Sequence, residues 1–217
     1  MFKPVRWNTF IRDFLVIQIG YALFGLAIAL TIRANLGTGT WPVLEVALSQ
    51  ATGWSVGAVT IAVGFVVLFI ALVLREKIGW GPLTNIIFIG LWLDLVLWFV
   101  PPVKGNLPLQ IVMLLGGVLI QGIASAIYIG VNAGAGPRDS LMLALHRTTK
   151  LSLRMARGVV EILVLLAGWL MGGPVGIGTV VFALLIGPSV QWAFKLFNVH
   201  PHKEDEEVQA GIQGGVE

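Results

Sequence analysis

The sequence predicts an all-α membrane protein of about six transmembrane helices, arranged as two inverted three-span repeats, each with a short re-entrant or interfacial helix. Three observations predict this fold class: the composition, a series of long apolar segments, and an internal repeat. Of the 217 residues, 57% are hydrophobic and only 12% are charged, whereas soluble domains carry about 25% charged residues. The mean hydropathy of +0.89 therefore excludes an ordinary water-soluble fold.

The apolar segments have the length that membrane crossing requires. A spanning helix needs about 20 mostly apolar residues, and six such segments are predicted near 14–32, 56–74, 83–100, 109–131, 156–171 and 177–197. Two shorter amphipathic segments, 41–51 and 140–148, have the length of re-entrant or interfacial helices. The first apolar run is long and is not followed by a small-residue cleavage site, so it predicts an uncleaved span.

The chain contains an internal repeat. Residues 20–90 align without a gap on residues 117–187, at an offset of 97, and 20 of the 71 pairs are identical. Seven of these identities pair glycine with glycine, which apolar composition alone does not explain. Such internal similarity predicts two copies of one structural unit, as in many transporters.

The basic residues predict that the two copies are inverted. With three spans per copy and a cytoplasmic N-terminus, 12 of the 14 Lys and Arg residues lie inside, and only Arg33 and Lys104 lie outside. The positive-inside rule favours this arrangement. Counting the short segments as spans gives eight crossings, parallel copies and a poorer split of 10 against 4.

The predicted organisation follows from this topology. Residues 1–13 form a cytoplasmic N-terminus, 14–100 the first membrane repeat, 101–108 an external loop, 109–197 the second membrane repeat, and 198–217 a cytoplasmic tail. The tail is acidic and has little apolar surface to bury, so it is predicted to be disordered.

Composition also argues against several functions. The chain has no cysteine, which removes thiolate catalysis, disulfides and thiol metal sites. The net charge of +3 comes from basic residues spread over loops, so no nucleic-acid partner is predicted. No catalytic constellation, cofactor motif or metal-ligand set is present, and an enzyme is not expected. The sequence also lacks a nucleotide-binding Gly-x-x-x-x-Gly-Lys-Ser/Thr motif.

The motif Asn-x-Gly-x-Gly occurs once in each copy, directly after a span and before a short helix. It comprises Asn35, Gly37 and Gly39 in the first copy and Asn132, Gly134 and Gly136 in the second. Paired broken helices in transporters point their N-termini at a substrate, so these residues are candidates for substrate binding. Alternatively, the glycines serve only tight turns and close helix packing.

The copies diverge just after this motif, where Arg138 and Asp139 replace Trp41 and Pro42. Arg138 can hold a carboxylate or phosphate, and Asp139 can cap the short helix or neutralise Arg138. Alternatively, Arg138 is only another positive-inside residue. Both are candidate substrate-binding residues.

Ionisable groups inside apolar segments are costly and are functional candidates. Glu161 lies one turn after Arg157, so the two can pair at i, i+4, and both are candidates for substrate binding. Glu161 and Asp94 are candidates for an ion or proton site. Glu45, in the first short segment, is a weaker candidate.

The string NAGAGPRDSLMLAL at 132–145, together with GWLMGGPVGIGT at 168–179, resembles the YczE-like family of bacterial integral membrane proteins. The resemblance covers nearly the whole chain except the acidic tail. It implies a multi-pass protein of the bacterial plasma membrane but does not imply a substrate. Thr40 and Pro42 depart from the Gly-Pro-Trp-Asp-like run that family members often have in the first copy.

The leading hypothesis is a small-solute transporter or permease with a midplane site between the repeats. Its partners would be the lipid bilayer and a small-molecule solute. Two alternatives remain open: a substrate-binding membrane subunit that works with an energy-coupling partner, and an accessory or regulatory membrane protein. Architecture alone does not decide among them.

Overall fold

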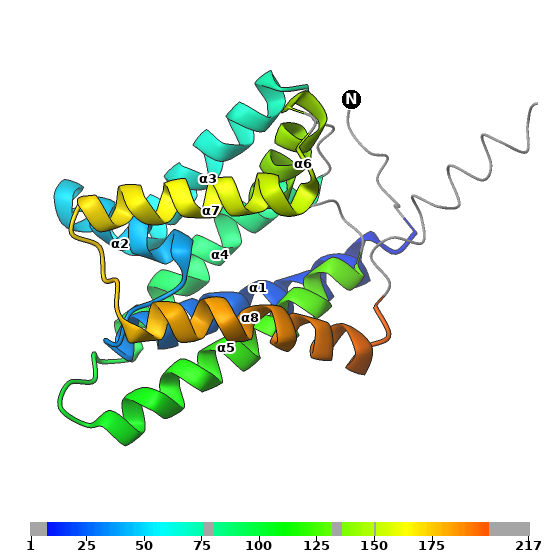
Figure 1. Cartoon of the computed structure of the whole chain (residues 1–217). Helices are drawn as coiled ribbons and strands as arrows, with labels where there is room; N and C mark the ends of the chain where they lie inside the picture. Colours follow the sequence, from blue (N-terminus) through cyan, green and yellow to red (C-terminus); the bar gives the residue numbers. More distant parts are fainter. Residues whose placement is uncertain (1–7, 76–79, 132–135, 150, 200–217) are drawn as a thin grey trace, which may run out of the picture.

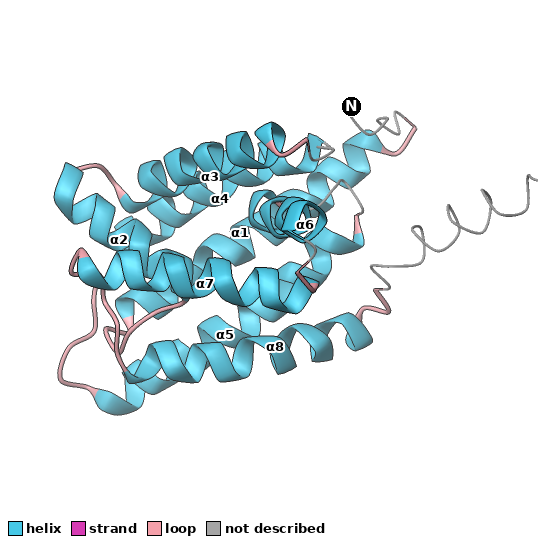
Figure 2. Cartoon of the chain, turned by 45° about the horizontal axis from the view of Figure 1, so that its top comes forward, coloured by secondary structure: helices cyan, strands magenta, loops and turns pink. Residues whose placement is uncertain are grey.

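The computed structural model describes residues 8–75, 80–131, 136–149 and 151–199, and these residues form helices and loops without a strand (Figures 1 and 2). The N-terminal segment 1–7, Asn132, Gly134 and the tail from residue 200 lie outside the described residues. The helices are α1 (Phe10–Arg33), α2 (Thr40–Thr52), α3 (Val56–Val73), α4 (Trp80–Phe99), α5 (Leu107–Gly130), α6 (Pro137–Thr149), α7 (Leu153–Leu170) and α8 (Ile177–Leu196).

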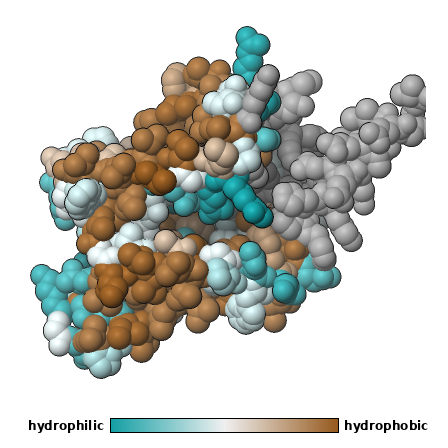
Figure 3. Space-filling view, viewed as in Figure 1, coloured by the Kyte–Doolittle hydropathy of each residue, from teal (hydrophilic) through white to brown (hydrophobic). Residues whose placement is uncertain are grey.

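Five of these helices, α1, α3, α4, α5 and α8, are long and apolar enough to cross a membrane. Large apolar side chains point outward, such as Phe69 at 66% and Leu184 at 68% exposure, and apolar atoms cover most of the face shown in Figure 3. Helix α7 has 18 residues but includes Arg154, Arg157 and Glu161 and is not among the five. The sixth span therefore stays a prediction. Helices α2 and α6, with 13 residues each, are too short to span.

The two halves of the chain have matching helices. Adding 97 to the first and last residue of α1, α2, α3 and α4 gives the first and last residue of α5, α6, α7 and α8. Local features repeat as well: Ser55 and Ser152 both cap the following helix by accepting a hydrogen bond from the backbone N–H three residues later. The helix positions thus reproduce the 97-residue offset found in the sequence.

The helices form two layers. The first layer contains α1, α4, α5 and α8, in which α1 packs on α5, α4 on α1, and α8 on α5. The second layer contains α2, α3, α6 and α7, in which α2 packs on α7, α3 on α6, α2 on α3, and α6 on α7. Each layer therefore contains two helices from each repeat. In Figure 1, α1, α5 and α8 lie below α3, α6 and α7.

Paired glycines allow the long helices to approach closely. A methyl group at Gly25 would lie 2.8 Å from the backbone nitrogen of Leu93 in α4, and one at its equivalent, Gly122, would lie 2.2 Å from Ser189 in α8. Packing through small residues is common between membrane helices. Some of the glycine identities between the repeats are therefore explained by equivalent helix contacts.

Candidate functional site

A cavity of about 490 Å³ lies between the two layers, and all eight helices or their first turns contribute to its wall. Its volume is within the range typical of small-molecule sites. In Figure 3, hydrophilic atoms lie in a hollow between two apolar halves of the surface.

The cavity lies where the two repeats meet. Every lining residue from the first repeat has its equivalent, 97 positions later, in the wall as well. The eleven pairs are Phe24/Gln121, Ile28/Ser125, Gly39/Gly136, Thr40/Pro137, Trp41/Arg138, Pro42/Asp139, Thr60/Arg157, Gly64/Glu161, Asn85/Phe182, Ile86/Ala183 and Ile89/Ile186. The second repeat supplies all four charged residues of this wall, at positions where the first repeat has Trp, Pro, Thr and Gly.

The first glycine motif packs against α8. Asn35 and Gly37 both have positive φ, 54° and 100°, and a methyl group at Gly37 would lie 2.6 Å from the backbone nitrogen of Gly176. The backbone N–H of Gly178 donates to the carbonyl of Leu36. Asn35 and Gly37 are therefore held by a tight turn and close packing, and they do not line the cavity.

The last glycine of each motif does reach the cavity. Gly39 and Gly136 both line it, as do the first residues of α2 and α6 that follow them. Because backbone N–H groups in the first turn of a helix have no partner within the helix, both short helices direct polar ends toward the same space. Of the second motif, only Gly136 lies within the described residues.

Arg138 bonds to a carboxylate that the sequence reading ranked as a weak candidate. Its Nη2 donates to Glu45 Oε1 at 2.5 Å, and the guanidinium lies 4.7 Å from the ring centroid of Trp41. Glu45 is fully buried and also accepts a hydrogen bond from Thr60 Oγ1 at 3.0 Å. This pair joins α2 of the first repeat to α6 of the second.

Arg157 and Glu161 form the predicted i, i+4 pair, with Nε donating to Oε1 at 3.0 Å. Their side chains are 59% and 37% exposed, and both line the cavity. This pair is therefore open to the cavity and is not enclosed by other side chains.

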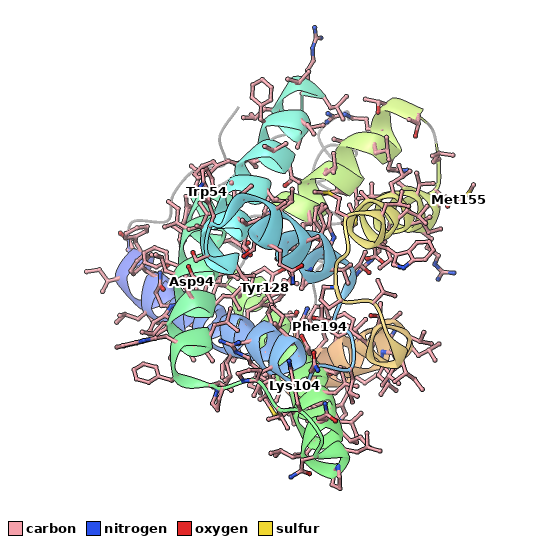
Figure 4. All side chains as sticks on the ribbon, turned by 90° about the vertical axis from the view of Figure 1, so that its left-hand side faces the viewer. Trp54, Asp94, Lys104, Tyr128, Met155 and Phe194 are labelled. Carbon is pink, nitrogen blue, oxygen red and sulfur yellow. The ribbon has the colours of Figure 1, made fainter. Side chains whose placement is uncertain are left out.

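Asp139, at the start of α6, also lines the cavity and accepts a hydrogen bond from the hydroxyl of Tyr128. Burial raises the pKa of this carboxyl, while the guanidinium groups of Arg157 and Arg138 act in the opposite direction. Tyr128 belongs to α5 and lies in the interior of the molecule (Figure 4).

Asp94 lies away from the cavity wall. Its carboxylate accepts hydrogen bonds from Ser55 Oγ at 2.5 Å and from the backbone N–H of Gly57 at 2.7 Å. It therefore caps the start of α3 and joins α3 to α4. No cluster of three His, Asp or Glu side chains suited to a metal ion occurs among the described residues.

Sequence reasoning did not identify Tyr128, Gln121, Ser125 and Gln191 as cavity residues. A signal was present in the repeat, because Gln121 and Ser125 replace Phe24 and Ile28 at equivalent positions of an otherwise apolar helix. Comparing the two copies for apolar-to-polar replacements within spans would have found both residues.

Comparison with known proteins places the chain in a family. A family of unknown function, DUF6198, matches residues 11–195. An uncharacterized protein of Haemophilus influenzae is 31% identical over 90% of this chain and 89% of its own length. The uncharacterized membrane protein YczE of Bacillus subtilis is 32% identical over 84% of this chain and 82% of its own. YyaS of the same bacterium is 31% identical over 78% and 86%.

No solved structure matches the chain. The similarity to a membrane protein and the five long apolar helices agree on a multi-pass membrane location. The family description and the names of these relatives state no activity or substrate. The chain belongs to the DUF6198 family and is a YczE-like integral membrane protein.

Proposed function

We propose that this protein is a small-solute transporter whose binding site is the cavity between two inverted repeats. The observation that carries the proposal is the cavity itself: charged and polar groups line a space between two layers of otherwise apolar helices, and eleven pairs of equivalent positions from the two repeats form most of its wall. Charged groups inside membrane segments commonly mark substrate or ion pathways. Transporters built from repeats bind their substrate where the repeats meet.

The helix contacts support a two-fold relation between the repeats. The contact of α2 with α7 has its counterpart in the contact of α6 with α3, and the contact of α1 with α4 in that of α5 with α8. Helices α1 and α5 pack on each other, as two equivalent helices beside a two-fold axis would. With three spans per repeat, such an axis lies in the membrane plane, in agreement with the 12 to 2 distribution of basic residues.

The wall chemistry favours a zwitterionic or anionic solute. Two guanidinium groups, Arg138 and Arg157, and two carboxyl groups, Asp139 and Glu161, line the cavity. Arg138 is already bonded to Glu45, whereas the Arg157–Glu161 pair is accessible. A solute with one positive and one negative group can bond to both members of the accessible pair.

The test is a thermal-unfolding screen of the purified protein against amino acids, betaines, dicarboxylates, sugars and simple salts. Binding to the native state raises stability by about 2.7 kcal/mol at a ligand concentration 100 times Kd. We expect stabilisation of the wild type by a zwitterion or an anion. Arg157→Gln and Glu161→Gln should lose it, and Lys104→Gln, a loss of positive charge in an exposed loop, should keep it.

A solute found in this way would then be tested for uptake into proteoliposomes. The proposal predicts uptake by the wild type and a loss of uptake in the variants that lose binding. Absence of stabilisation by every class, or equal loss of stabilisation in Lys104→Gln, would overturn the assignment of the cavity as the binding site.

A further inference from the structure

The two repeats differ in one helix contact. In the first repeat α3 packs along α4, whereas the equivalent helices of the second repeat, α7 and α8, do not pack closely in the part of the chain that the structure describes. Figure 1 shows α7 and α8 in separate halves of the molecule. The minor contact of α4 with α6 also lacks a close counterpart. Every remaining close helix contact is matched by the contact between the equivalent helices.

Glycines report the same difference at atomic detail. A methyl group at Gly90 of α4 would lie 2.5 Å from Ile61 and 2.6 Å from the carbonyl oxygen of Gly57, both in α3. The equivalents of Gly90 and Ile61 are Gly187 and Gly158, and a methyl group at either would meet no atom within 4 Å among the described residues. The surfaces of α7 and α8 that correspond to a tight contact are thus separated.

The residues whose hydrogen bonds close the first contact have equivalents in the second repeat. Asp94 of α4 bonds to Ser55 and to the backbone N–H of Gly57 at the start of α3. The equivalent of Asp94 is Gln191, which lines the cavity, and the equivalent of Ser55 is Ser152, which caps α7 in the same way. A glutamine amide can bond to a serine hydroxyl and to backbone N–H groups as the carboxylate does.

The cavity extends toward the open contact. Besides the eleven equivalent pairs, six further residues line it, and all six belong to the second repeat. They are Tyr128, Ile129, Met142, Gly187, Val190 and Gln191. Their first-repeat equivalents lie outside the wall, so the cavity is closed on the α3–α4 side and continues along α8 on the other.

We propose that the two repeats exchange these conformations during transport, so that the α3–α4 contact opens when the α7–α8 contact closes. Ser55 with Asp94 forms the closed gate in this structure, and Ser152 with Gln191 forms the gate in the other state. This inference rests on the proposed transport function. In the predicted topology the first gate lies toward the outside and the second toward the cytoplasm.

One substitution explains why the first gate is the closed one. Gly57 brings its backbone against Gly90 and Asp94, but its equivalent is Arg154, whose side chain prevents an equally close approach of α7 to α8. The closed α7–α8 contact is therefore wider and less stable. Glycine at 158 and 187, where an added methyl group would meet no described atom within 4 Å, leaves room for that contact.

The natural absence of cysteine allows a direct test in membranes. Two double variants are made at equivalent positions, Ser55→Cys with Asp94→Cys and Ser152→Cys with Gln191→Cys, and treated with a short bifunctional thiol reagent. The remaining free thiols are counted by PEG-maleimide labelling after denaturation. Each single cysteine variant is the control for labelling without an internal cross-link.

The first pair should cross-link rapidly, because the packing of α3 along α4 remains when the bonds of Ser55 and Asp94 are removed. The second should cross-link completely but roughly ten- to a thousand-fold more slowly, because a minor conformation is typically populated at 0.1–10%. Adding Asp94→Ala to the second pair removes two bonds of the closed gate and should raise its cross-linking rate about tenfold or more. Adding Arg154→Gly should also raise the rate, whereas adding Lys104→Ala should not.

Failure of the second pair to cross-link while the first reacts would overturn the exchange, and so would a rate that Asp94→Ala does not change. Failure of the first pair to react would contradict the closed α3–α4 contact. None of these results requires a solute. A chain that exchanges its gates but binds no solute would therefore contradict the proposed function alone, and a chain that binds solute without exchange would contradict this inference alone.

Discussion

Replacing Glu45 by Gln removes the negative charge that neutralises Arg138 inside the protein. The carboxylate is fully buried and bonds to Arg138 and to Thr60. Glutamine has a similar shape, so the substitution changes the charge with little change of volume. It leaves the guanidinium with its ring contact to Trp41 and its access to the cavity.

The expected cost follows from burial. Removing one partner of a buried ion pair costs about 3–5 kcal/mol, and we expect about 3 kcal/mol because the Arg138 side chain keeps 27% exposure. For a chain of this length each kcal/mol lowers the melting temperature by about 2–4 °C, so the expected decrease is about 6–12 °C. The accessible pair formed by Arg157 and Glu161 is worth only about 0.2–1 kcal/mol.

The assay is thermal unfolding in detergent followed by the fluorescence of the eight tryptophans. The double variant Glu45→Met with Arg138→Met should be more stable than Glu45→Gln, because replacing both members leaves no unpaired buried charge. A Glu45→Gln protein that melts within 2 °C of the wild type, to be judged against that expected decrease, would refute the claim that this pair joins the two repeats.

Three further stability predictions use the same assay. Gly90→Ala presses a methyl group against α3 and should cost about 1–3 kcal/mol, whereas the equivalent Gly187→Ala should be nearly neutral; equal effects would contradict the difference between the two contacts. Gly37→Ala combines a positive φ with a methyl group 2.6 Å from the backbone nitrogen of Gly176, just before α8, and should cost about 2–4 kcal/mol. Gly53→Ala also places alanine at a positive φ, but its methyl group meets no described atom within 4 Å, so it should cost about 1–2 kcal/mol. Glu161→Gln should lower stability by less than about 1 kcal/mol while removing the solute binding proposed for the cavity, and a large loss of stability would indicate a structural role instead.

Much of the fold follows from local properties of the sequence. The predicted apolar segments 56–74 and 177–197 coincide within one residue with α3 and α8, since apolar runs and flanking caps are encoded locally. The short segments 41–51 and 140–148 lie within α2 and α6. The 97-residue offset, seen first in glycine identities, holds for the bounds of all four helix pairs.

The candidate site was harder to predict because its contacts are long-range. Glu45 and Arg138 are 93 residues apart, and only the packing of α2 near α6 shows that they form a pair. Asp94 was a candidate ion site because acids in apolar segments are rare. In the structure its carboxylate bonds to Ser55, which caps α3, and to the backbone N–H of Gly57 in the first turn of α3. The difference between the α3–α4 and α7–α8 contacts also depends on packing that the similar sequences of the two repeats do not reveal.

Inversion of the two repeats is the central claim, and one labelling experiment tests it most directly. Thr52 and Thr149 are equivalent, both end a short helix, both are exposed, and each donates a hydrogen bond of 2.7 Å to the carbonyl four residues earlier. Each is replaced by Cys and treated with a membrane-impermeant maleimide in right-side-out spheroplasts, before and after permeabilisation. Inverted repeats predict that Thr52→Cys is labelled at once and that Thr149→Cys is labelled only after permeabilisation. Labelling of both from the same side would contradict inversion and, with it, the transport mechanism proposed for this protein.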